Sequence, residues 1–227
     1  TVVEDISPQL LKEIVENMVS RVDTGSGTGR FGQVSGFKFV YDTIGTRQLI
    51  DPNTGAISQV GTRVKTIVLD DGTPIVREGG VVSGAPDVTL ATANFLATGG
   101  DQYPLSGQNF TLLGVTDQQT LAAYLTQELD SVVTAAQYPE GGDGRIFRRP
   151  FDVDSVLTIE QARLFPEDDT VTFRGIVTRA KGRLTHLQAG GFAIGTFQSS
   201  GSYRDSVDSG FIDKGVEMEI QGERSDF

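Results

Sequence analysis

The spacing of apolar residues along the chain predicts two main helices. Residues 7–21, SPQLLKEIVENMVSR, carry leucine, isoleucine and valine at intervals of three and four residues. Ser7 is placed to cap the first turn and Pro8 suits its start. Residues 116–132, TDQQTLAAYLTQELDSV, repeat the pattern, with Thr116 as the expected cap.

Between these helices the apolar positions alternate with polar ones, as they do in half-buried strands. Residues 37–42, FKFVYD, have this period, and residues 63–75, RVKTIVLDDGTPI, predict a hairpin around Asp71 and Gly72. Residues 88–98 begin as a strand and run into a glycine turn. The pattern predicts an α+β (α/β) domain with mixed sheets and two main helices over residues 1–147.

The texture of the chain changes after this domain. Residues 148–154 have proline and charge without periodicity, which is typical of a linker. Residues 155–227 contain a short helix or turn at TIEQARLF and several short alternating strands, which predict a small all-β domain, an OB-like partial barrel. The segment stops just after a strand, so we expect this barrel to be incomplete.

Composition narrows the classes of function. The formal net charge of −11 disfavours nucleic acid and anionic membranes as partners. The chain has no cysteine and a single histidine, His186, so it cannot build a histidine-rich metal centre, and we expect no cofactor in it. No apolar run is long enough to predict a transmembrane segment. The opening residues, TVVEDISPQL, have neither Met nor a signal segment, so we expect a piece of a longer polypeptide.

Two motifs carry the candidate chemistry. Residues 94–103, NFLATGGDQY, place a ring, Tyr103, just after a glycine turn. That ring can face solvent, fill the edge of a core or stack on a flat ligand. Residues 29–42, GRFGQVSGFKFVYD, place a second ring, Phe31, before a strand. Together these motifs, with the order of elements around them, resemble the C-terminal, substrate-specificity domain of the 5′-nucleotidase family over residues 1–147.

The resemblance implies that Phe31 and Tyr103 hold a nucleobase between them, since stacking on aromatic rings tolerates any base. Packing at a loop is the alternative for both rings. The candidate substrate-binding residues are Phe31, Tyr103, Asp101, Gly99, Gly100, Arg30 and Asn94. Among these, Asp101 also suits a turn-stabilising role, Asn94 a bond to the backbone, and Arg30 a surface charge.

The family's catalytic domain, with its divalent metal ions, has no counterpart in this chain. The resemblance therefore implies a nucleoside- or nucleotide-binding part of a phosphoesterase, extracellular, periplasmic or associated with the cell envelope, which is not catalytic alone. Its expected partner is an N-terminal metallophosphoesterase domain or another envelope protein. Residues 155–227 resemble, more loosely, the OB-fold modules of secreted bacterial nucleases and nucleotidases.

The chain also departs from the family pattern. Gln102 stands where the family has glycine, and the run PLSGQNF lacks the ribose-binding acid, for which Ser106 or Asn109 could substitute. An alternative function is therefore a non-catalytic structural or interaction module of a cell-envelope assembly, with an open strand edge for pairing. A nucleic-acid-binding face is a third hypothesis, which the net charge disfavours; its candidates are Arg174, Arg179, Lys181 and Arg183.

Overall fold

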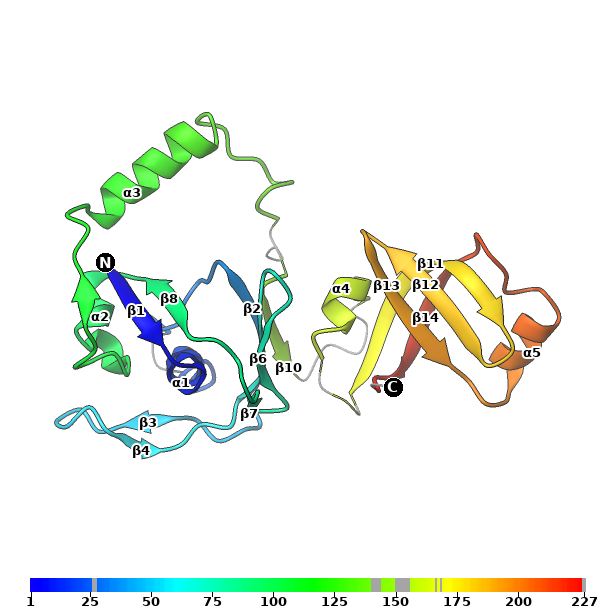
Figure 1. Ribbon diagram of the computed structural model, residues 1–227, viewed down its shortest axis with the longest axis horizontal. Coiled ribbons are helices and arrows are strands. Elements are labelled where there is room, and N and C mark those ends of the chain that lie inside the picture. The colour runs from blue at the N-terminus through cyan, green and yellow to red at the C-terminus, as the bar shows by residue number, and fades with distance from the viewer. Residues whose placement is uncertain (26–27, 140–143, 150–155, 166, 168, 226–227) are drawn as a thin grey trace. The chain divides into compact units, whose positions relative to one another are not determined.

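The structure is a computed structural model that describes residues 1–25, 28–139, 144–149, 156–165, 167 and 169–225 (Figure 1). The chain forms two compact units, Thr1–Pro150 and Phe151–Phe227. The division between them falls after residue 150, and residues 150–154 of the predicted linker lie outside the described residues. The two units are described separately.

Helix α1 (Pro8–Met18) is the centre of the first unit. It begins as predicted, since the Ser7 hydroxyl accepts a hydrogen bond of 3.2 Å from the Leu10 amide, and it ends at Met18, before the predicted residue 21. Its face of Leu11, Ile14 and Val15 is buried. Burial of such a face, rather than helix propensity alone, stabilises a helix of this length.

The larger sheet of the first unit has the strand order β10-β2-β5-β6-β7. The predicted hairpin joins β5 and β6, and the Asp71 carboxylate accepts a bond of 2.9 Å from the Thr73 amide in its turn. Strand β10, at the C-terminal end of the first unit, belongs to this sheet as well. It pairs in parallel with β2, with Ile146 opposite Phe39. The bounds are β2 Phe37–Asp42, β5 Val64–Leu69, β6 Pro74–Arg77, β7 Gly80–Val81 and β10 Ile146–Arg149.

A second sheet of this unit has the order β8-β1-β9, and β3 and β4 form a short pair. Short helical segments follow β8, and α3 with its continuation η2 follows β9. The predicted Thr116 cap is present at α3, as a capping box with Gln119. The bounds are β1 Val2–Ile6, β3 Leu49–Ile50, β4 Ile57–Gln59, β8 Val88–Ala91, α2 Asn94–Ala97, η1 Gly100–Gln102, β9 Phe110–Thr111, α3 Asp117–Ala123 and η2 Tyr124–Glu128.

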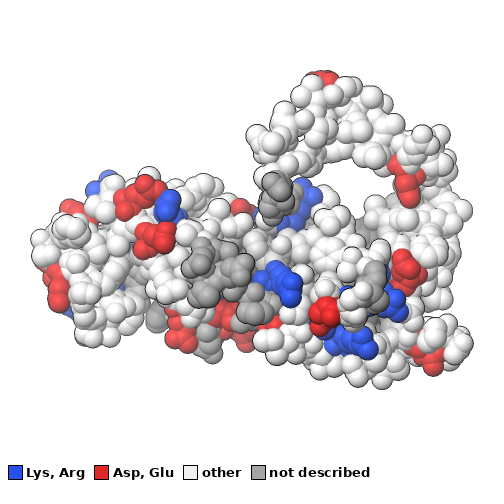
Figure 2. All heavy atoms as spheres, turned by 180° about the vertical axis from the view of Figure 1, so that it is seen from behind, with Lys and Arg blue, Asp and Glu red and all other residues white. Residues whose placement is uncertain are grey.

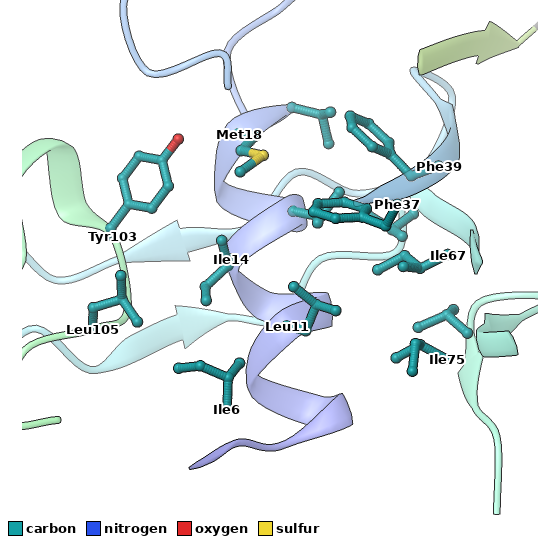
Figure 3. Close-up of a cluster of buried hydrophobic side chains, with 14 of the residues drawn as sticks. Ile6, Leu11, Ile14, Met18, Phe37, Phe39, Ile67, Ile75, Tyr103 and Leu105 are labelled. Carbon is teal, nitrogen blue, oxygen red and sulfur yellow. The ribbon is translucent and has the colours of Figure 1, made fainter. Parts of the chain in front are cut away.

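The core of the first unit surrounds α1 (Figure 3). Side chains of β2, β5 and β6, including Phe39, Ile67 and Ile75, pack on one side of the helix, and Tyr103 and Leu105 pack on the other. Because Tyr103 closes this core, the loop that carries it is fixed by packing against the helix.

The second unit is a four-stranded antiparallel sheet with the order β13-β12-β11-β14. The predicted alternation is clear in β11, where Val171, Phe173 and Val177 face the core. Helix α4 begins at the Thr158 cap within the predicted TIEQARLF segment, whereas α5 was not predicted. The bounds are α4 Ile159–Ala162, β11 Thr170–Lys181, β12 Leu184–Ala189, β13 Phe192–Phe197, α5 Ser202–Asp208 and β14 Glu217–Glu223.

Helices together with mixed and antiparallel sheets make this an α+β protein, as the sequence predicts at that level. Among the helices of the described residues, none has the length and apolar character needed to cross a lipid bilayer.

Candidate functional site

The two motifs singled out in the sequence meet in the first unit. The Tyr103 hydroxyl donates a hydrogen bond of 2.7 Å to the carbonyl oxygen of Arg30. In the same place an Arg30 Nη2 donates to Gln102 Oε1 at 2.8 Å. Two segments more than 70 residues apart in the sequence therefore form one local structure.

The Arg30 side chain is fixed from the end of α1. Its Nη1 donates to Asn17 Oδ1 at 3.1 Å and to Ser20 Oγ at 3.3 Å, and both of these partners are buried. Asn17 Nδ2 in turn donates to the Asp101 carbonyl at 3.1 Å. Burial lowers the pKa of the Arg30 guanidinium from its usual value, but arginine stays a cation in proteins.

The sequence reading missed Asn17, although a signal for it was available. Asn17 lies one turn after Ile14, on the helix face that carries the core residues. A polar side chain in that position has to find hydrogen-bond partners when it is buried. Here those partners are the Arg30 side chain and the Asp101 backbone.

The turn that carries Tyr103 has an unusual backbone. Gly99 has φ of 92°, and Asp101 and Gln102 follow with φ of 51° and 59°. The left-handed conformation costs a non-glycine residue about 1–2 kcal/mol. At Gly100 the restriction is spatial, because an added Cβ would lie 2.5 Å from the Phe95 ring and from the Phe95 carbonyl oxygen.

The side chain of Gln102 offsets part of that cost. Its Oε1 accepts from Arg30, and its Nε2 donates to the Ile50 carbonyl at 2.8 Å. Gln102 therefore ties the turn both to the first motif and to strand β3. A glycine in this position would relieve the backbone strain but would make neither bond.

Tyr103 is buried with 4% of its surface exposed, and its ring lies among the core side chains of α1 near Met18 (Figure 3). Burial, followed by the Asp101 charge, raises the pKa of its hydroxyl to about 12. Of the three roles considered for this ring, the structure shows that it fills the edge of the core. Its faces are not open to a flat ligand in this conformation, so stacking by Tyr103 stays a prediction.

Phe31 and the remaining candidates lie around this turn or beside it. Phe31 is half-buried and meets the Tyr41 ring edge-on, with centroids 6.3 Å apart. The Asp101 side chain is exposed, and it is the Asp101 carbonyl that is held in place by Asn17. Asn94 begins α2 and is exposed, and its carbonyl accepts a bond of 3.1 Å from the Thr98 amide.

The second unit contains a pocket of about 410 Å³ next to α4, lined by residues that include Glu160, Arg174 and Phe192. Arg174, one of four basic residues considered for a nucleic-acid face, forms an ion pair of 2.9 Å with Glu219 on the neighbouring strand β14. This pairing neutralises one positive charge of that face.

The search for metal-binding groups among the described residues and the comparisons with family models and curated proteins both gave no match. Within the described residues, no three His, Cys, Asp or Glu side chains gather into a group that could hold a metal ion. No protein-family model matches the chain, and no curated protein matches it. A function has to be argued from the residues and their geometry.

Proposed function

We propose that the first unit binds a nucleoside or nucleotide, as the substrate-binding C-terminal part of a 5′-nucleotidase-like phosphoesterase. The observation that carries the proposal is the meeting of the two motifs, through the bonds from Tyr103 to the Arg30 carbonyl and from Arg30 to Gln102. Motifs that bind one ligand together have to lie side by side, and these two do.

Each residue of this place has a separate task in the proposal. Phe31 provides the ring on which a base stacks, and Tyr103 holds the turn that carries Phe31 through its hydroxyl. Arg30 supplies a fixed positive charge for the sugar or phosphate, because its partners Asn17, Ser20 and Gln102 are all neutral. Asp101 is exposed beside Tyr103 and accepts hydrogen bonds from the ribose hydroxyls. It thereby takes the place of the ribose-binding acid that the run PLSGQNF lacks.

The backbone of the turn supports the resemblance to the family. The family's motif has glycine where this chain has Gln102, and Gln102 has the left-handed conformation that glycine adopts without strain. The same backbone path thus suits both sequences, and Gln102 adds bonds of its own.

Hydrolysis belongs, in this proposal, to a metal-containing domain outside the chain. The described residues hold no group suited to a metal ion, and the first unit would deliver the nucleoside to that centre. The activity would take place outside the cytoplasm, at the cell envelope or in the extracellular space, as it does for the family that the chain resembles.

The test is calorimetric titration of the intact chain with adenosine and with AMP. Phe31→Leu keeps an apolar side chain but removes the ring, and stacking is worth about 1–3 kcal/mol, so we expect about tenfold weaker binding of both ligands. Phe211→Leu removes an exposed ring of the second unit and serves as the matched control, with unchanged affinity.

A second variant separates positioning from stacking. Tyr103→Phe keeps the ring and removes the bond to the Arg30 carbonyl, so we expect weaker binding with the fold preserved. Binding of neither ligand up to millimolar concentration, or equal affinity of the Phe31→Leu variant and the unchanged chain, contradicts the proposal.

A further inference from the structure

Residues 112–138 form an arch that stands away from the rest of the first unit (Figure 1). Helix α3 and its continuation η2 make up its upper part, and the space-filling view shows an opening beneath it (Figure 2). No residue from 106 to 139 is buried. The arch therefore contributes no side chain to either hydrophobic core.

The arch is held together by its own hydrogen bonds. Thr116 and Gln119 form the capping box at its start, and the hydroxyl groups of Tyr124 and Tyr138 lie 2.8 Å apart across it. These bonds fix its shape, but they do not remove apolar surface from water. A helix this short is marginal in water without a packing partner.

The apolar side chains of the arch follow a pattern that is typical of a buried surface. Leu121, Tyr124, Leu125 and Leu129 recur at helical spacing on one face of α3 and η2. Leu121 of this face is 59% exposed, and exposed residues lie before and after the helix as well: Leu112 is 63% exposed, Val115 56% and Val133 58%. Large apolar side chains exposed together in one segment are typical of an interaction site.

The charge around the arch identifies the kind of partner. Within residues 112–138 the chain contains no lysine or arginine. The acidic residues of the arch are Asp117, Glu128 and Asp130. A partner that complements the arch has an apolar face flanked by lysine or arginine.

We propose that the arch is the docking site for a basic amphipathic segment of another polypeptide, which packs its apolar face against Leu121 and its neighbours. The arrangement fits the packing of an amphipathic helix against an exposed apolar helix face. A second copy of the chain is disfavoured, because it would bring another arch without lysine or arginine, and the same net charge of −11, against this one. Anionic membranes are disfavoured too, because helices that bind them carry lysine and arginine on the polar face.

The test uses two synthetic amphipathic peptides with the same leucine face. One has flanking lysines and the other flanking glutamates, and their binding to the intact chain is followed by fluorescence anisotropy. We expect the lysine peptide to bind at least tenfold more tightly than the glutamate peptide, and its affinity to fall as salt is added.

Paired variants connect that binding to the arch. The double variant carries Leu121→Gln and Val133→Gln. Both side chains are exposed, so the fold should persist. We expect the variant to bind the lysine peptide at least tenfold more weakly than the unchanged chain does. Ile44→Gln changes a residue that is 82% exposed outside the arch and should leave binding unchanged.

Three results overturn the proposal: no binding of the lysine peptide, equal binding of both peptides, or binding that the arch double variant leaves intact. Sedimentation that shows a dimer abolished by the double variant also overturns it, because it assigns the arch to a second copy of the chain.

Discussion

Glu16 lies inside the first unit with 1% of its surface exposed. Its Oε1 accepts from the Val64 amide at 2.9 Å and its Oε2 from the Arg63 amide at 3.1 Å, so it joins α1 to the start of β5. Burial raises the pKa of this carboxyl above its usual 4.5, against the opposing effect of the two backbone bonds. At a pH between the unfolded and the raised pKa, the folded state therefore binds more protons than the unfolded state.

The pH dependence of stability follows from that difference. Stability should fall as pH rises from about 4.5 through the raised pKa of Glu16, because the folded protein binds more protons in this range. In Glu16→Gln we expect this fall to disappear, along with a loss of about 1–3 kcal/mol for the backbone amide left without an acceptor. Urea denaturation between pH 4 and 7 measures both effects.

A control variant, and the difference between Glu16→Gln and the unchanged chain, isolate the contribution of Glu16. Glu4→Gln removes an exposed carboxylate in the same unit and serves as the control for the loss of one acidic side chain. Asp23 acts in the opposite direction, since its bond from Arg63 lowers its pKa, so its contribution is lost at low pH. Asp23 is present in both the unchanged chain and Glu16→Gln, so its effect cancels in the difference between their stabilities. If the stability of Glu16→Gln has the same pH profile as that of the unchanged chain, the pH dependence does not come from Glu16.

Gln102 allows backbone strain to be separated from side-chain bonding. Both Gln102→Ala and Gln102→Gly remove the bonds to Arg30 and Ile50, at a cost of about 1–3 kcal/mol. Only glycine adopts the left-handed backbone conformation of this position without strain. We therefore expect Gln102→Gly to be about 1 kcal/mol more stable to unfolding than Gln102→Ala. Urea unfolding of the two variants measures the difference, and alanine at least as stable as glycine would contradict the turn as described.

At the scale of single residues, the resemblance implied that the two motifs lie together, and the sequence left open whether Tyr103 faces solvent, fills a core edge or stacks on a ligand. A ring between a glycine turn and Pro104 has no periodic pattern to say which way it faces. Its burial depends on α1, a segment far away in the sequence, and on the carbonyl of Arg30 as a hydrogen-bond partner.

Among the elements, α3 and α4 begin with the same device in different surroundings. Thr116 and Thr158 each form a capping box, but α3 lies in the exposed arch and α4 contributes Ile159 and Ala162 to the core of the second unit. The two threonines are a matched pair for measuring what tertiary packing adds to a cap.

Substitution of each cap should therefore have a different effect. We expect Thr158→Ala to lower the stability of the second unit by about 1 kcal/mol. Thr116→Ala should speed amide exchange within α3 while leaving the unfolding midpoint of the first unit unchanged. Hydrogen exchange with mass spectrometry, combined with urea denaturation, distinguishes them; a lower midpoint in Thr116→Ala would mean that α3 contributes to the core after all.

The elements that the sequence predicted well have strong local signals. Helix α1, the β5–β6 hairpin, the Thr116 cap and the alternation of β11 depend on spacing or on turn residues. Strand β1 was missed because it reads VVEDI, with charged residues at successive positions, and Asp5 has a positive φ of 56°. Its pairing with β8 and β9 on either side forms the strand, and that is a tertiary effect.

For the whole molecule, the two hydrophobic cores can be tested one at a time. Phe39 is fully buried in the first unit, so Phe39→Ala should cost that unit about 3–5 kcal/mol, a large part of the usual stability of a domain. Hydrogen exchange of peptides from residues 1–149 would report the loss. Phe211→Ala, at a residue 81% exposed, is the control and should have no such effect.

Strand β10 has a consequence for synthesis on the ribosome. It completes the larger sheet by pairing Ile146 with Phe39, so one edge of β2 stays open until the chain has been made that far. At about 5–20 residues per second, the hundred or so intervening residues take roughly 5–20 s to translate. Throughout this time a nascent chain presents an open edge of an apolar strand, and this is the period in which a chaperone would be needed most.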